Sequence, residues 1–84
     1  MWYVYIIECA DGTLYTGIST DVNKRIETHN KGKGAKYTKT RLPVVLRAYF
    51  EAENRSLASK EEYRIKQLTR EKKLTLINKY GENK

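Results

Sequence analysis

The stretch YVYIIECADGTLYTG, residues 3–17, decides the fold of this sequence. Its first half is rich in β-branched and aromatic residues, which favour strands, and Ala10-Asp11-Gly12 is typical of a turn between two strands. A two-residue loop would place Tyr5 and Tyr15 on opposite faces of this hairpin. A three-residue loop, in which the glycine of the turn takes the left-handed conformation, pairs Tyr5 with Gly17 and puts both tyrosines on one face.

The second pairing has a chemical implication. A buried phenol must find a hydrogen-bond partner, so two phenols on one sheet face make an unusual core. Gly17 has no side chain and leaves space across from the Tyr5 ring. The pattern favours the floor of a pocket, and the alternative is ordinary packing of an aromatic-rich sheet face.

Beyond the hairpin, the sequence predicts one more strand and three helices. The predicted elements are a helix over 21–30 that Ser19 or Thr20 caps, a basic loop over 32–42, a strand over 44–51 after Pro43, a helix up to residue 68 that Ser56 caps, and a last helix that Thr69 caps. The order β-β-α-β-α-α predicts an α+β fold, a small three-stranded antiparallel sheet flanked by helices, in a single domain over residues 1–84.

Composition excludes several classes of protein. Cys9 is the only cysteine, which excludes an internal disulfide and a cysteine-rich metal site. No apolar run is long enough to span a bilayer, and the apolar opening is too short for a signal peptide. We therefore expect a cytoplasmic protein, a monomer or weak dimer, without a membrane partner or a small-molecule cofactor.

Positive charge is concentrated in one part of the chain. The net charge is +7, and residues 23–41 hold seven basic side chains and one acid, Glu27. Localised positive charge is typical of a protein that binds a polyanion such as nucleic acid. It is equally typical of a solvated surface that keeps a small protein in solution.

At this point the sequence resembles a known family. Tyr3-Val4-Tyr5 and Tyr15-Thr16-Gly17 are similar to the two halves of the GIY-YIG nuclease signature, with Tyr3 in place of a glycine and Thr16 in place of isoleucine or valine. Other matching positions are Arg25 and His29 on the first predicted helix, KGAKYT over 33–38, and Glu62 at the head of EYRIKQLTR. The resemblance covers nearly the whole chain and is strongest with small stand-alone bacterial GIY-YIG proteins.

The resemblance implies a catalytic site for phosphodiester hydrolysis. It implies that Tyr5 helps to activate a water molecule, that Arg25 neutralises the phosphate, and that Tyr15 and His29 contact the phosphate or relay a proton. The pKa of a free tyrosine is near 10, so Tyr5 needs positive charge beside it to act as a base. Taken singly, these side chains fit sheet packing, an exposed helix arginine and a helix C-terminal histidine better than a catalytic role. Taken jointly, with their spacing kept, they favour the site.

Glu62 is the metal ligand that the resemblance implies, with Mg²⁺ or Mn²⁺ as the metal. One carboxylate with waters and phosphate oxygens is an ordinary Mg²⁺ site. A helical wheel built on Leu57, Ile65 and Leu68 instead places Glu61 nearer the centre of the apolar face. Both glutamates also fit solvent-exposed pairs with neighbouring lysines.

The basic loop has the plainest interpretation. Lysine neutralises phosphates, small residues allow close approach and tyrosine stacks on bases. We therefore expect sequence-tolerant binding of nucleic acid, with DNA as the favoured kind. The expected contacts are Gly17, Lys33, Lys36, Tyr37, Lys39 and Arg41. The leading hypothesis is a metal-dependent DNA endonuclease, and the alternative is a non-catalytic nucleic-acid-binding module of the same fold.

Overall fold

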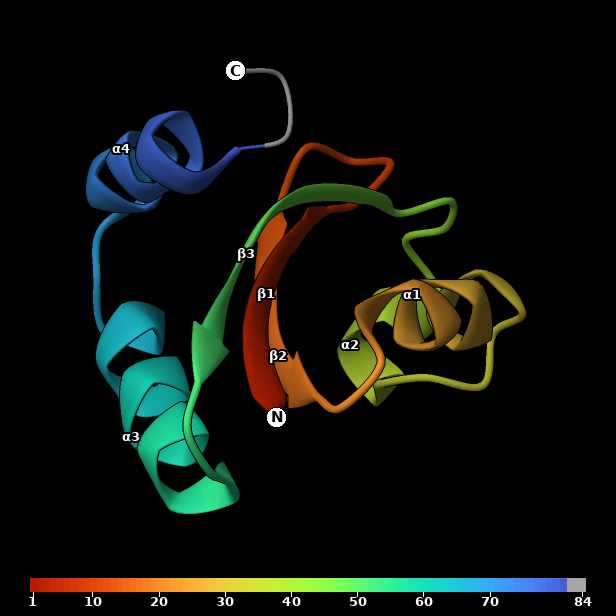
Figure 1. The fold of residues 1–84 in the computed structure, drawn as a ribbon. Helices are drawn as coiled ribbons and strands as arrows, with labels where there is room; N and C mark the ends of the chain where they lie inside the picture. Colours follow the sequence, from red (N-terminus) through yellow and green to blue (C-terminus); the bar gives the residue numbers. More distant parts are fainter. Residues whose placement is uncertain (82–84) are drawn as a thin grey trace.

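The computed structural model describes residues 1–81 and contains a three-stranded antiparallel sheet in the order β2-β1-β3. The strands are β1 (Trp2–Glu8), β2 (Leu14–Ser19) and β3 (Val45–Ala52). The first strand of the chain is therefore the central one, with helices on both faces of the sheet (Figure 1). The expected α+β class and the three-stranded sheet are confirmed.

The hairpin has the register of the three-residue loop. Tyr5 pairs with Gly17, and Ile7 pairs with Tyr15. The turn is closed by the Cys9 N–H, which donates to the Thr13 carbonyl at 2.8 Å, while the glycine of the turn has φ 85°. Tyr5 and Tyr15 consequently share the sheet face that α1 covers.

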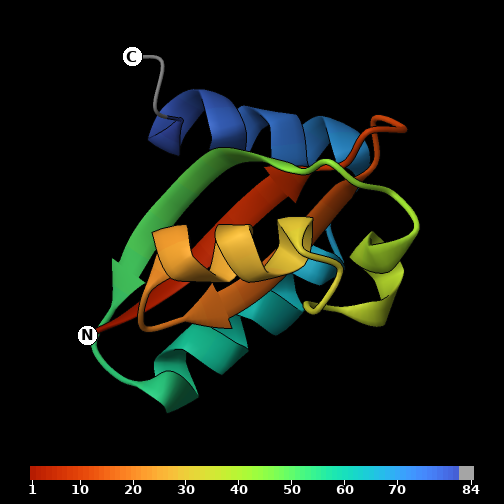
Figure 2. The same cartoon turned by 90° about the vertical axis from the view of Figure 1, so that its right-hand side faces the viewer.

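Helices α1 (Val22–Asn30) and α2 (Lys36–Lys39) cover one face of the sheet, and α3 (Arg55–Lys66) and α4 (Arg70–Tyr80) cover the other (Figures 1 and 2). None of the helices in residues 1–81 is long and apolar enough to cross a membrane. The sequence predicts a loop over 32–42, but the short helix α2 forms within this segment.

Two of the predicted helix caps are wrong. The Asp21 side chain, rather than Ser19 or Thr20, accepts a hydrogen bond from the first turn of α1. Asn54, which precedes Ser56, caps α3 in the same way at 2.9 Å. In both cases a side chain with an sp² oxygen occupies the N-cap position itself, where such oxygens reach the free N–H groups of the first turn.

Each face of the sheet has its own apolar core. The core under α3 and α4 consists of Val4, Ile6, Ala48, Ala58, Ile65 and Ile77. The core under α1 consists of Tyr5, Ile7, Cys9, Val22 and Val44. Only the second core contains a buried phenol, so the sheet face under α1 is the chemically distinctive one.

A side-chain bridge attaches the end of α1 to the start of β3. The Asn30 amide accepts a hydrogen bond from the Val44 N–H at 2.7 Å and donates to the Val44 carbonyl at 3.1 Å. Val44 is buried, so these backbone groups have little access to water. The bridge holds the last turn of α1, including the neighbouring His29, against the sheet.

We expect Asn30→Ala to lower the free energy of unfolding by about 2 kcal/mol, because it leaves a buried N–H and a buried carbonyl without their partner. Urea denaturation followed by circular dichroism measures the change. Asn78→Ala is the matched control, because Asn78 is exposed on α4. Equal stability of the two variants would show that the bridge does not hold α1 in place.

Candidate functional site

The site is built around a buried pair of polar side chains. Tyr5 is 1% exposed and His29 is fully buried, and the Tyr5 hydroxyl lies 2.9 Å from Nε2 of His29. A Cβ atom at Gly17 would lie 2.6 Å from Cζ of the Tyr5 ring. The sequence predicts open space across from Tyr5, and this prediction is wrong, because the ring itself lies against the glycine. Gly17 lets the phenol reach His29.

Thr38 determines which nitrogen of His29 carries the proton. The Thr38 hydroxyl donates to the Ala35 carbonyl at 2.9 Å and lies 2.8 Å from Nδ1 of His29, so it accepts from an Nδ1–H. Nε2 is then free to accept the Tyr5 proton. In this arrangement Nδ1 carries a proton and cannot accept the longer hydrogen bond, at 3.4 Å, from the Ala35 N–H. The result is a continuous chain from Tyr5 through His29 to Thr38.

Burial and charge give Tyr5 and His29 different proton affinities. Burial raises the pKa of Tyr5, and the Arg25 guanidinium beside it lowers that pKa by hydrogen bonding and by charge without offsetting the burial. Burial, together with the charge of Arg25, lowers the pKa of His29. At neutral pH the phenol therefore keeps its proton while the imidazole is uncharged and able to accept one.

Glu62, rather than Glu61, acts electrostatically on Tyr5. The negative charge of Glu62 raises the pKa of Tyr5. Glu61 is instead held by Arg64, which donates two hydrogen bonds to its carboxylate at 2.8 and 3.1 Å. The helical wheel was centred wrongly, because Leu57 is 41% exposed and the buried face of α3 runs through Ala58 and Ile65.

Tyr15 links the two sides of the site. Its ring centroid lies 5.7 Å from that of His29 and 5.8 Å from that of Tyr37, which stacks on it. On its other side it meets α3, where the Lys66 ammonium lies 5.7 Å from the ring centroid. Tyr15 sits on the edge strand β2, so side chains from α1, α2 and α3 meet around it.

The carboxylate present fits a weakly held divalent cation. Within residues 1–81, no three His, Cys, Asp or Glu side chains come together as a metal-binding group. Glu62 is a single carboxylate whose side chain is 24% exposed. Mg²⁺ commonly binds to one or two carboxylates and completes its octahedron with waters and substrate phosphates. The donor set suits that mode.

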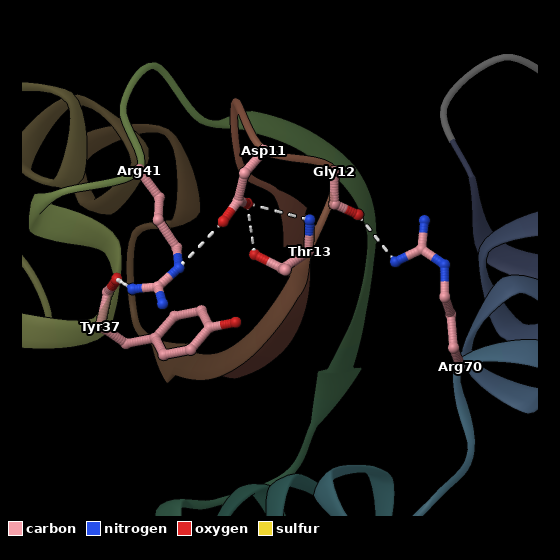
Figure 3. A network of polar contacts seen from close by, with 6 residues as sticks. All are labelled: Asp11, Gly12, Thr13, Tyr37, Arg41 and Arg70. Atoms are coloured by element: carbon pink, nitrogen blue, oxygen red, sulfur yellow. Dashed lines mark hydrogen bonds and ion pairs between the residues drawn. The ribbon is translucent and has the colours of Figure 1, made fainter.

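The predicted nucleic-acid contacts fall into three groups. Gly17 is buried against the Tyr5 ring, so it is not a surface contact. Lys33, Lys36 and Lys39 are exposed. Arg41 instead pairs with Asp11 at 3.1 Å, donates to the Tyr37 carbonyl at 2.7 Å and lies 4.1 Å above the Tyr37 ring (Figure 3). Arg41 and Tyr37 are thus engaged within the protein, where they support Tyr15, and the lysines are the cations that face solvent.

Sequence reasoning missed two residues of this site, Thr38 and Lys66. The hydroxyl of Thr38 lies in a segment that resembles the family, but nothing local indicates that it meets a histidine. Lys66 pairs with Glu62 at 3.4 Å. The two residues are four apart, about one helical turn, so the sequence already indicated a possible ion pair. Only the structure adds that Tyr15 lies beside this pair.

Comparison with known proteins finds a family model and relatives that cover nearly the whole chain. The family model of the GIY-YIG catalytic domain matches residues 1–79. A UPF0213 protein of Staphylococcus aureus is 57% identical over 75 residues, which cover 89% of this chain and 92% of the relative. The solution structure of a UPF0213 protein from Bacillus halodurans is 47% identical, with a TM-score of 0.62 over 98% of this chain and 88% of that one. A solution structure from E. faecalis is 38% identical, with a TM-score of 0.61 over 92% and 82% of the two chains.

We expect His29, the only histidine of the sequence, to titrate below the ordinary value of about 6.5. Because the unfolded chain then binds a proton before the folded one does, the contribution of His29 to the free energy of unfolding should be constant above about pH 7 and fall as pH drops below about 6.5. NMR titration of the imidazole and urea denaturation at several pH values measure both effects. His29→Gln should lack this part of the pH dependence. A titration midpoint above 6.5 would contradict the buried neutral imidazole.

Proposed function

Because the chain belongs to the GIY-YIG family, we propose that it is a nuclease that hydrolyses phosphodiester bonds of DNA with one divalent metal ion, Mg²⁺ or Mn²⁺. The observation that carries the proposal is the convergence of side chains from three parts of the fold. Tyr5 and Tyr15 come from neighbouring strands, and Arg25 and His29 come from α1 above them. Glu62 comes from α3 and acts electrostatically on Tyr5.

Hydrolysis of a phosphodiester needs an activated water, neutralisation of the phosphate charge and stabilisation of the leaving oxygen. Glu62 would hold the metal ion, which supplies positive charge to the phosphate and the leaving oxygen. The water gives one proton to the Tyr5 oxygen as the Tyr5 hydroxyl gives its own to Nε2 of His29. The resulting hydroxide attacks phosphorus, and the bond from phosphorus to the leaving oxygen breaks as that oxygen takes a proton from solvent.

This route explains why a phenol with a raised pKa suits the site. Tyr5 never has to ionise in the resting enzyme, because its proton leaves for His29 only as another arrives from the water. The imidazole starts uncharged, and its Nδ1–H stays on the Thr38 hydroxyl throughout the transfer. Arg25, beside the phenol, would bind phosphate oxygens with its forked donors.

The exposed lysines around α2 extend the proposal to substrate binding. Lys33, Lys36 and Lys39 are on the surface next to the site, and lysine contacts to phosphates give affinity without reading sequence. We therefore propose that DNA lies along the α1 and α2 side of the molecule, with its backbone passing Tyr15.

We expect Glu62→Gln to abolish metal-dependent cleavage of DNA, because it removes the proposed carboxylate ligand. The measurement is gel analysis of plain, nicked and branched DNA with Mg²⁺ or Mn²⁺ against EDTA. The matched control is Glu61→Gln, one residue away and paired with Arg64, which should retain activity. Full activity of Glu62→Gln, or cleavage in EDTA, would refute the assignment of the metal ligand.

Arg25→Ala separates an enzyme from a protein that only binds. We expect single-turnover cleavage to fall by about 10² to 10³, because the arginine stabilises charge that develops in the transition state, with a much smaller loss of affinity. Lys36→Ala, an exposed cation of the basic segment, should mainly weaken binding and lower the salt slope by about one unit. If both variants lose similar affinity and no cleavage distinguishes them, the non-catalytic binding module is the better account.

A further inference from the structure

Lys66 occupies a position that ordinary surface lysines do not. Its ammonium lies 3.4 Å from the Glu62 carboxylate and 5.7 Å from the centroid of the Tyr15 ring. One cation therefore pairs with the proposed metal ligand and also lies near the ring of Tyr15. The Lys66 side chain is 45% exposed, so it can leave this position without unpacking the core.

A second lysine–glutamate pair shows what is particular about this one. Lys31 and Glu27 on α1 have the same one-turn spacing at 3.2 Å, but their side chains are 64% and 67% exposed. The Glu62 side chain is only 24% exposed, and its charge reaches the buried Tyr5. The Lys66 ammonium beside Glu62 thus changes the charge of the proposed catalytic site. The Lys31 ammonium beside Glu27 changes only the charge of the protein surface.

We propose, on the basis of the proposed function, that Lys66 gates the metal ligand and couples metal binding to nucleic-acid binding. Without nucleic acid, the ammonium neutralises Glu62 and repels a divalent cation from it. A phosphate of bound DNA offers Lys66 another anion, draws it away from Glu62 and leaves the carboxylate free. Because binding linkage is reciprocal, release of Lys66 from Glu62 also strengthens its contact with the phosphate.

The size of the effect follows from the charges. The ammonium and a divalent ion beside the same carboxylate repel each other, and salt screens part of this repulsion. Removing the ammonium should therefore tighten metal binding by roughly tenfold at low salt. Replacing lysine by arginine keeps the charge and should leave the affinity near that of the unchanged protein.

The first experiment uses Mn²⁺ alone, measured as free Mn²⁺ by electron paramagnetic resonance without nucleic acid. We expect Lys66→Met to bind Mn²⁺ about tenfold more tightly than the unchanged protein. Lys66→Arg and the control Lys31→Met should bind Mn²⁺ with the affinity of the unchanged protein. If Lys66→Met has unchanged affinity while Glu62→Gln loses it, the gate is wrong and the metal ligand stands. If Glu62→Gln retains Mn²⁺ binding, the gate and the proposed metal site fail together.

The second experiment tests the link to nucleic acid in EDTA, where no cleavage occurs. Glu62→Gln frees Lys66, and we expect it to tighten binding of a fluorescently labelled DNA duplex by about two- to fivefold. Most of this gain should vanish when Lys66→Met is added, because the freed cation is then missing. An equal gain from Glu62→Gln with and without Lys66 would overturn the coupling. Thermal unfolding of each variant verifies that all of them are folded.

Discussion

The hydrogen bond between the Tyr5 hydroxyl and His29 is the interaction on which the rest of the site depends. A phenol and an imidazole are both buried here, and each would be costly without a partner. The requirement explains the bare Gly17 opposite Tyr5, because a side chain there would occupy the space of the ring. It also explains Gly34, where a Cβ would lie 2.8 Å from Cγ of His29. Both glycines make room for one polar contact.

Much of the fold could be predicted from the sequence, because its decisive features are local. The hairpin register follows from a short turn and from the constraint that a one-residue slip moves every side chain to the other face. The strand that follows Pro43 and the helix that Thr69 caps also carry signals within a few residues. The order of the elements then leaves few arrangements for a chain of this length.

The site was harder to predict, because its contacts join distant segments. Helix α2 has only four residues, and Ala35 at its N-cap makes no capping hydrogen bond through a side chain, so neither periodicity nor a cap indicates it. Thr38 acquires its role only when this helix lies beside α1. Arg41 carries the charge expected of a phosphate contact, but Asp11, from the hairpin turn, pairs with it. Charge patterns identify cations, and the fold decides which of them remain on the surface.

The central position of β1 has a consequence for how the chain folds. The core under α3 and α4 joins Val4 of the first strand to Ile77 of the last helix, so it closes only when nearly the whole described chain has come together. The hairpin, by contrast, needs only its own turn. Loop-closure entropy delays contacts between distant residues. We therefore infer that the two faces of the sheet assemble at different times, with the hairpin serving as the template on which the two later helices close the opposite core.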